Sequence, residues 1–289
     1  MNKERLMISD TKKQFTEDEI KAFKPEEKIG IVASITPEGL PHVSLITSIQ
    51  AANPTVVTIG EFCKGKSKEF IQKNNHIGFL IMTLDRKVWR GKARWTHFKK
   101  EGPEFEAYNN LPMFRYNAYF GIHTVHFFDL VETYGQEGLP LGSIVLSSLM
   151  TKWAKSGVKT SIQDRILKPF AEGIFNRLDA LKFIAWIADD GFPVIIPVLQ
   201  CQAADSRRLA FSSLAYRKEL KTIPKGVPVA VFGLTMKMED VLIRGTFNGF
   251  STSRFTEVGS VDIDWVYNSM PPCHGQIYPE IPLVPVVEF

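Results

Sequence analysis

The chain is poor in cysteine and has no long apolar run, and each of these lacks excludes a class of protein. Its 289 residues include three cysteines, Cys63, Cys201 and Cys273, an odd and widely separated set that suits neither a disulfide framework nor a zinc site. No apolar run approaches the roughly 20 residues that cross a bilayer. The first residues, MNKERLMISDTKKQ, are charged and do not read as a signal peptide. We therefore expect a cytoplasmic protein with no membrane partner.

Strong charge and the common catalytic signatures are also missing. The net charge is +4, and most lysines are scattered, whereas nucleic-acid binders gather basic residues on one face. The six histidines show no metal-ligand spacing, so we predict no metal site. No Ser-His-Asp order, phosphate-binding P-loop or dinucleotide glycine fingerprint occurs. We therefore set aside nucleic-acid binders, hydrolases, kinases and Rossmann dehydrogenases.

What the chain does contain is a repeat of itself. The segment IVASITPEGLPHVSLITSIQAA at 31–52 resembles FIAWIADDGFPVIIPVLQCQAA at 183–204. Gly39 matches Gly191 and Pro41 matches Pro193, at one offset of 152 residues (191 − 39 and 193 − 41). Each copy begins as a hairpin, with a type I turn expected at Thr36-Pro37-Glu38-Gly39 and again before Gly191. We interpret this as a tandem duplication.

The order of elements in each copy favours a small barrel. Several short β-rich segments follow one another with turn residues between them and one short helix. Between the copies, apolar residues recur at helical spacing, most clearly at Ile166, Phe170, Ile174 and Leu178. We predict a mainly β fold with barrel domains at 1–135 and 180–289, joined by a helical connector at 136–179.

One basic stretch precedes the short helix of the first copy. CKGKSKEF at 63–70 places Lys64, Lys66, Ser67 and Lys68 at the expected helix start. Unpaired amides and the helix dipole favour an anion there, and lysines add charge. We interpret the stretch as a phosphate site in which Ser67 is either the N-cap or a direct donor. A solvated basic loop is the alternative.

The motifs in this order resemble the FMN-binding split-barrel family that includes pyridoxamine 5'-phosphate oxidase. The residues that carry the resemblance are Gly39-Leu40-Pro41, Lys66-Ser67-Lys68, the apolar segment 77–82 and Arg90-Gly91-Lys92-Ala93. The resemblance implies two tandem split β-barrels, FMN as the cofactor, and a barrel pair formed either by a homodimer or by an internal pseudo-dimer. The chain lacks a match to residues that such an oxidase uses for pyridoxamine phosphate, so the vitamin B6 reaction is not implied.

Two further groups of residues are candidate FMN contacts. Arg90 and Lys92 share one strand face and form either a second arm of the phosphate clamp or a row of solvent-facing charges. In the family, the strand HVSLITSIQ runs beside the flavin ring, so Ser44 or Thr47 is expected to donate to its polar edge. On a regular strand only one of the two faces the ring.

The second copy departs from the first at the basic stretch. Tyr216-Arg217-Lys218 replaces Lys66-Ser67-Lys68, which indicates either a weaker site or a barrel that has lost its site and walls the first one. We favour the second interpretation, in which Trp186 and Trp265 are either ring contacts or core residues.

The leading function is an FMN-dependent oxidoreductase that passes electrons from a reductant, such as a nicotinamide, to a small-molecule substrate. A protein that binds or senses a flavin, deazaflavin or haem without turnover is the alternative. A scaffold without a cofactor is the third interpretation. No catalytic side chain is predicted, because a flavin carries the redox chemistry itself.

Overall fold

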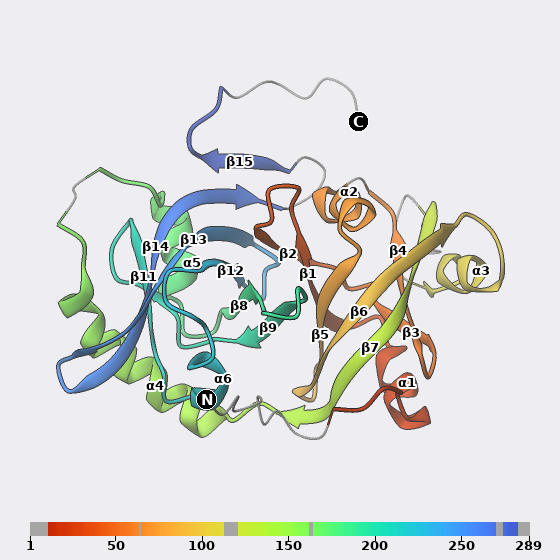
Figure 1. Cartoon of the computed structure of the whole chain (residues 1–289), viewed down its shortest axis with the longest axis horizontal. Helices are drawn as coiled ribbons and strands as arrows, with labels where there is room; N and C mark the ends of the chain where they lie inside the picture. The colour runs from red at the N-terminus through yellow and green to blue at the C-terminus, as the bar shows by residue number, and fades with distance from the viewer. Residues whose placement is uncertain (1–10, 64, 113–120, 162–163, 270–273, 283–289) are drawn as a thin grey trace. The chain divides into compact units, whose positions relative to one another are not determined.

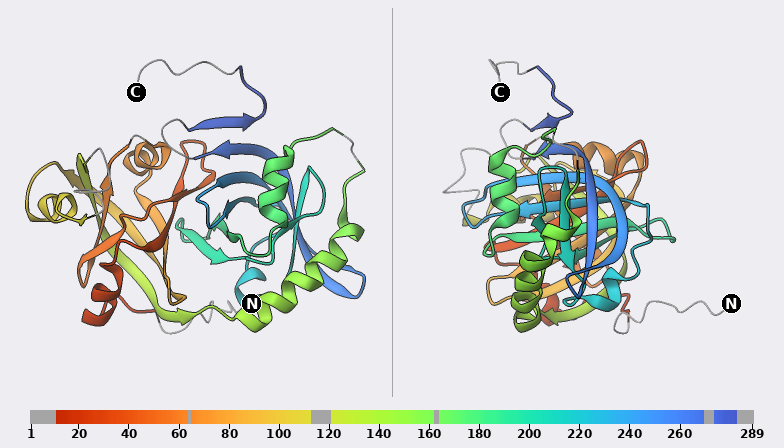
Figure 2. Two further views of the ribbon diagram at one scale, coloured as in Figure 1. Left: turned by 180° about the vertical axis from the view of Figure 1, so that it is seen from behind. Right: turned by 90° about the vertical axis from the view of Figure 1, so that its left-hand side faces the viewer.

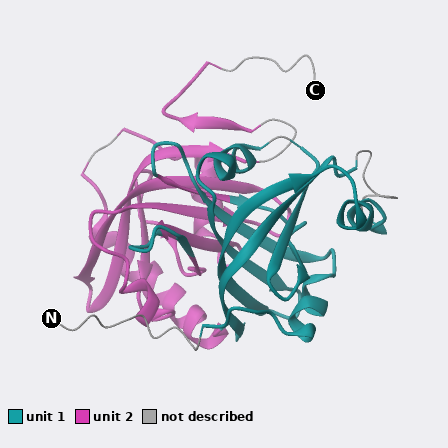
Figure 3. Cartoon of the chain, turned by 45° about the vertical axis from the view of Figure 1, so that its right-hand side comes forward, with its two compact units in different colours: residues 1–39, 44–139, 187–194 teal, residues 40–43, 140–186, 195–289 magenta. Residues whose placement is uncertain are grey.

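The computed structural model describes residues 11–63, 65–112, 121–161, 164–269 and 274–282 (Figure 1). The chain divides into two compact units (Figure 3). Unit 1 comprises residues 1–39, 44–139 and 187–194, and unit 2 comprises residues 40–43, 140–186 and 195–289. Each unit therefore includes a short segment from the opposite half of the sequence.

The first sheet has seven strands in the order β2-β1-β5-β6-β7-β4-β3. Long β6 and β7 pair antiparallel along most of their length, with irregularities that bend them. The strands are β1 (Lys28–Ile35), β2 (Pro41–Leu45), β3 (Gln50–Asn53), β4 (Val56–Glu61), β5 (His76–Thr83), β6 (Lys87–Lys99) and β7 (Thr124–Gly138).

The second sheet has the path β9-β8-β12-β13-β14-β11-β10, with β15 added on β14. The tail that follows the second barrel thus contributes a strand to that same sheet. The strands are β8 (Leu181–Ile187), β9 (Pro193–Pro197), β10 (Gln202–Ala203), β11 (Arg208–Ser212), β12 (Pro228–Leu234), β13 (Asp240–Ser253), β14 (Thr256–Asn268) and β15 (Gly275–Tyr278).

The two strand orders are the same once each strand of the first half is matched to its counterpart in the second. The hairpin turns agree as well: Gly39 N–H donates to Thr36 at 2.9 Å, and Gly191 N–H donates to Ala188 at 2.9 Å. Both glycines have positive φ, 78° and 80°, which a residue without Cβ adopts at no steric cost. The predicted mainly β fold, with two barrels related by duplication, is confirmed.

Helices accompany both sheets (Figure 2). Helices α1, α2 and α3 belong to unit 1, and in unit 2 helix α4 packs on β11 and β14 while α5 packs on β10. The helices are α1 (Glu17–Phe23), α2 (Lys66–Lys73), α3 (Pro103–Asn109), α4 (Leu141–Ala154), the 3-10 turn η2 (Lys155–Val158), α5 (Pro169–Asn176) and α6 (Arg217–Leu220).

The helical connector forms as two helices, but the second is shorter than the apolar spacing predicts. Helix α5 begins at Pro169, so Ile166 precedes it, and it ends before Leu178. Phe170 is 60% exposed and Leu178 is 55% exposed, while Ile174 is buried. The four-residue spacing therefore overstated the helix, because proline fixes the first turn and cannot extend it backwards.

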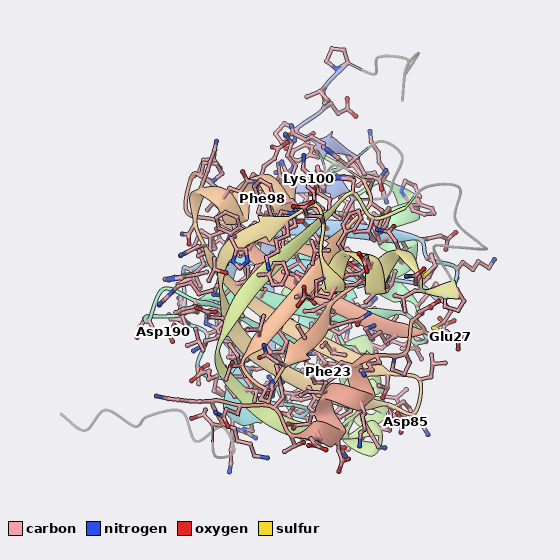
Figure 4. All side chains as sticks on the ribbon, turned by 90° about the vertical axis from the view of Figure 1, so that its right-hand side faces the viewer. Phe23, Glu27, Asp85, Phe98, Lys100 and Asp190 are labelled. Carbon is pink, nitrogen blue, oxygen red and sulfur yellow. The ribbon has the colours of Figure 1, made fainter. Side chains whose placement is uncertain are left out.

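The core of unit 1 lies between its sheet and α1. Phe23, Phe79 and Trp89 are at most 1% exposed, and the Phe23 and Trp89 rings meet edge to face at 5.2 Å. Phe23 is labelled in Figure 4, inside the unit. Trp89 thus belongs to the core of unit 1.

The segment 187–194 is held in unit 1 by several kinds of contact. The ring of Phe192 stacks on His76 at 3.9 Å, and the His76 Nδ1 lies 3.1 Å from the carbonyl of Gly191. Gly78 lies so close to Pro193 that an added Cβ would be 2.3 Å from its carbonyl oxygen. Asp190, at the edge of the unit in Figure 4, pairs with Lys92 at 2.6 Å. Unit 1 is thus completed by residues that lie 48 or more positions beyond the end of its main segment at 139 (187 − 139).

Candidate phosphate site at the start of α2

The start of α2 is a helix end without a side-chain cap. Gly65 occupies the N-cap position in extended conformation, and no side chain bonds the first-turn amides. Lys68 N–H bonds back to Gly65 at 3.1 Å, which leaves the amides of Lys66 and Ser67 directed out of the helix end. Such amides and the helix dipole together favour an anion.

Ser67 is the side chain that distinguishes this end from an ordinary basic loop. It is 4% exposed and lies in the first turn of α2. Of the two roles predicted for Ser67, the N-cap position is filled by Gly65. A serine hydroxyl in the first turn of a helix can donate to an anion that binds at the helix end.

The flanking lysines differ in their surroundings. Lys66 pairs loosely with Glu69 at 3.3 Å on the exposed helix face. Lys68 Nζ donates to the carbonyl of Cys63 at 3.2 Å, so this ammonium lies over the turn that leads into the helix. Lys64 lies outside the described residues. Both described lysines have a weak partner that an anion can replace.

Of the two predicted ring contacts, Ser44 lies in strand β2 and Thr47 lies on the turn that follows it. Strand β2 ends at Leu45, and a turn closes by the bond from Ile49 N–H to Ile46 at 3.3 Å. Ser44 and Thr47 are both partly exposed, and neither has a hydrogen-bond partner among the residues described. The strict alternation expected from the sequence therefore does not apply to Thr47, and both hydroxyls are available.

A residue that the sequence reasoning missed ties this turn to the phosphate site. Ser48 Oγ donates to Gly60 at 2.7 Å, and Gly60 stands at the end of β4, just before the basic stretch. Tyr108 OH donates to the Ser48 carbonyl at 2.7 Å and lies 3.0 Å from Thr58. The buried phenol and serine thus hold the turn at 46–49 beside β4. No local pattern signals this role, because the partners are far apart in sequence.

A second missed group lies at the same strand end. Trp95 Nε1 donates to His126 Nδ1 at 3.2 Å, and His126 Nε2 lies 2.9 Å from Glu61. Because an indole N–H only donates, Nδ1 must accept, and the ring proton resides on Nε2 and points at the carboxylate. Burial raises the pKa of Glu61, but the bond from His126 and the charge of Lys68 outweigh it, so that the pKa is lowered.

Arg90 and Lys92 are occupied by carboxylates. Arg90 is 2% exposed and forms a two-pronged pair with Glu137, at 2.9 Å to each oxygen. Lys92 contacts Glu132 at 2.8 Å and Asp190 at 2.6 Å. Thr124 of β7 pairs with Glu61 of β4, and Glu132 lies eight residues further along β7. Eight residues correspond to roughly 26 Å along a strand. The role of Arg90 and Lys92 as phosphate ligands stays a prediction.

The equivalent position in the second copy has a different form. Helix α6 is four residues long, and Tyr216 precedes it in left-handed conformation with φ 58°. Trp186 is buried in the core, at 3% exposed, whereas Trp265 lies under the Arg244 guanidinium at 3.8 Å. Unit 2 thus lacks the helix start that unit 1 offers, within the described residues.

Within the described residues, neither metal binding nor a membrane-crossing helix has support. No group of three or more His, Cys, Asp or Glu side chains there is placed to hold a metal ion. In the same part of the chain, no helix has both the length and the apolar character to cross a membrane. A polar groove of about 430 Å³ lies at the opposite end of α2, lined by Gln72, Lys73, Asn74, Asn75, Trp95 and Thr96.

No protein-family model and no curated protein sequence matches the chain. Among solved structures, HupZ from Group A Streptococcus is similar at 14% identity, covering 41% of this chain and 91% of HupZ, with a TM-score of 0.34. An FMN-binding protein from Syntrophomonas wolfei is similar at 12% identity, covering 43% of this chain and 86% of that protein (TM-score 0.35). A provisional pyridoxamine 5'-phosphate oxidase from Lactobacillus delbrueckii is similar at 16% identity, covering 43% of this chain and 96% of that protein (TM-score 0.34). Each of these three proteins is matched over most of its own length by less than half of this chain.

Proposed function

We propose that the protein is an FMN-binding flavoprotein whose cofactor phosphate is held at the start of α2. The observation that carries the proposal is the position of Ser67, a residue 4% exposed in the first turn of a helix whose N-cap is a glycine. A phosphate offers acceptors to Ser67 and to the amides of Lys66 and Ser67. Lys66 and Lys68 would supply the balancing charge.

The same strand end offers groups for the rest of the cofactor. Thr47 and Ser44 have hydroxyls able to donate to a flavin edge, and the bond from Ser48 to Gly60 holds Thr47 in place. Glu61 adds negative charge near Lys68, so the site is tuned by a carboxylate and is not uniformly basic. These are binding and orienting roles. When bound, FMN would supply the electron transfer that these side chains cannot perform.

The activity that follows is oxidoreduction, with a nicotinamide as candidate reductant and a small molecule as acceptor. We expect one FMN per chain, because α6 is too short to offer an equivalent helix start. A homodimer, or an internal pseudo-dimer of the two barrels, stays a prediction. A binding protein without turnover would need the same residues and would differ only in failing to be reduced by a nicotinamide.

The test compares FMN with riboflavin, which differs from it by the phosphate alone. The freshly purified protein should be yellow and release FMN on denaturation, and its apo form should bind FMN more tightly than riboflavin. The variant Lys66→Ala/Ser67→Ala/Lys68→Ala should lose that preference while unfolding at the wild-type temperature. Arg217→Ala/Lys218→Ala, at the equivalent position of the second copy, should keep it. A triple variant that retains the preference would place the phosphate elsewhere.

A further inference from the structure

Helix α4 has the reverse of the usual pattern for a helix on a sheet. The buried side chains include Ser147, Ser148 and Thr151, whereas Leu141, Val145, Leu146, Leu149 and Trp153 are 38–58% exposed. Steps of four residues advance about 40° around a helix. Leu141, Val145, Leu149 and Trp153 therefore form one continuous outward stripe, here called the α4 stripe together with Leu146.

The small polar residues hold the helix in this orientation. The Thr151 hydroxyl accepts from Ser212 N–H at 2.8 Å, and Ser147 Oγ donates to the Ser212 carbonyl at 3.3 Å. Gln202 donates to the carbonyl of Ser148 at 2.8 Å. A rotation that buried the stripe would break these bonds inside the unit. The exposure of the stripe is therefore built into the packing and does not follow from a loose helix.

The tip of the β13–β14 hairpin extends the apolar surface. Arg254 and Phe255 form its two-residue turn with φ of 46° and 62°, the left-handed values of a type I′ turn. Such a turn favours Asn and Gly, yet this one carries a phenylalanine that is 99% exposed. A large ring at a strained and fully exposed position has no folding role, so it points to a partner.

The tip and the helix lie together (Figures 1 and 2). Ser253 Oγ donates to the carbonyl of Ala154 at 2.7 Å, and Arg254 donates to the carbonyl of Trp153 at 3.2 Å. The Arg254 guanidinium also lies 5.8 Å from the centre of the Trp153 ring. Phe255 and Trp153 thus belong to one surface at the C-terminal end of α4.

The charges around this surface select its partner. Residues 138–163 contain three lysines, Lys152, Lys155 and Lys159, and no aspartate or glutamate. Arg254 adds a fourth cation at the hairpin tip. A second copy of the chain would bring the same stripe and lysines, without a carboxylate from this segment to meet them. A bilayer with anionic headgroups offers both the negative charge and the apolar depth that this surface needs.

We propose that the α4 stripe and Phe255 dock the protein on the surface of an anionic membrane. Phe255, Leu149 and Trp153 would enter the interface between headgroups and acyl chains, with Lys152, Lys159 and Arg254 at the headgroup level. This docking needs no helix that crosses the bilayer. It departs from the expectation of no membrane partner, which rested on the length of apolar runs, and it is independent of the proposed cofactor.

The test is sedimentation of the full chain with vesicles. The protein should sediment with vesicles of phosphatidylcholine and phosphatidylserine, remain in solution with phosphatidylcholine alone, and be released by salt. Phe255→Asn keeps a residue suited to positive φ and should weaken binding about tenfold. Lys152→Gln/Lys159→Gln should weaken it by an amount on the order of 20-fold. Met236→Gln, a residue 71% exposed elsewhere on unit 2, should leave it unchanged.

Two results would overturn the proposal. One is a wild-type chain that stays in solution with anionic vesicles at low salt. The other is a wild-type dimer that Leu149→Gln converts to a monomer in sedimentation velocity, because the stripe would then be covered by a second copy. Unfolding curves of Phe255→Asn check that its turn is intact, and we expect them to match or exceed wild-type stability.

Discussion

Lys182 stands in the second repeat where Gly30 stands in the first, and both carbonyls accept the same turn-closing bond. Ile46 N–H donates to the Gly30 carbonyl at 2.7 Å, and Val198 N–H donates to the Lys182 carbonyl at 2.8 Å. The two backbones are alike, but the space beside them is not. A Cβ at Gly30 would lie 2.1 Å from the carbonyl oxygen of Ile46, whereas the second repeat accommodates a whole lysine.

Gly30→Ala should therefore destabilise unit 1 by about 2 kcal/mol, the usual cost of an overpacked site. The turn at 46–49 must move, which would also strain the bond from Ser48 to Gly60. Urea unfolding measures the cost. Gly138→Ala is the matched control, because nothing lies within 4 Å of the added Cβ there. Equal unfolding midpoints for the two variants would show that the turn yields freely.

Lys182→Met should change how stability depends on alkaline pH. Burial lowers the pKa of Lys182 from 10.5 to about 8, although its ammonium donates to the carbonyls of Arg177 and Leu199. Between these values the unfolded chain holds a proton that the folded chain has released, so stability rises with pH. Relative to Lys182→Met, the wild-type free energy of unfolding should rise by on the order of 3 kcal/mol across that window.

Urea unfolding at closely spaced pH values measures this rise. Lys237→Met, at an exposed lysine, should run parallel to the wild type throughout. If the free energy of unfolding of Lys182→Met depends on pH in the same way as that of the wild type, Lys182 binds its proton equally well in the folded and the unfolded chain.

Glu61→Gln should remove part of the acid sensitivity of unit 1. The folded pKa of Glu61 is lowered from 4.5, so its charged form stabilises the fold above that pH. At neutral pH the variant should be less stable by about 1 kcal/mol, the typical worth of a charge-assisted bond after solvent screening. The difference should vanish as the pH falls through the folded pKa. Glu106→Gln, at an exposed helix position, should show no such convergence, and thermal unfolding from pH 7 to pH 3 compares the three proteins.

Lys92→Met should leave two carboxylates facing each other. Burial alone would lower the pKa of Lys92, but the bonds to Asp190 and Glu132 raise it, so the ammonium is held charged. Loss of a partly buried charge from such a group costs about 3 kcal/mol. Lys92→Met/Glu132→Gln should recover more than half of that in chemical unfolding, because one of the two repelling charges is gone.

The control for Lys92 is Lys87→Met on the same strand. Lys87 pairs with Asp85 at 2.9 Å with both side chains about half exposed, and such pairs contribute little. If Lys92→Met and Lys87→Met lower the free energy of unfolding by similar amounts, burial is not the reason that the Lys92 cluster stabilises the fold.

The barrels could be predicted because their signals are local. The turn glycines Gly39 and Gly191, and the strand segments around them, fix hairpins within a few residues. The start of α2 was predicted for the same reason, since Lys66, Ser67 and Lys68 adjoin one another.

Contacts between distant segments could not be predicted. Ser48 meets Tyr108 across 60 residues, and Lys92 meets Asp190 across 98. A strand alternation shows that Lys92 shares a face with Arg90, but it does not show which carboxylates will occupy that face. The α4 stripe was likewise hidden, because helical spacing identifies an apolar face without saying whether it turns inward.

The short segments that each unit takes from the other half of the sequence bear on how the chain is made. Unit 1 includes residues 187–194, so Asp190 and Phe192 must leave the ribosome before the pairs with Lys92 and His76 can form. The first barrel therefore lacks these two contacts until α4, α5 and β8 have been synthesised. We expect a gene cut between the repeats to encode a first fragment that lacks the contacts of Asp190 and Phe192.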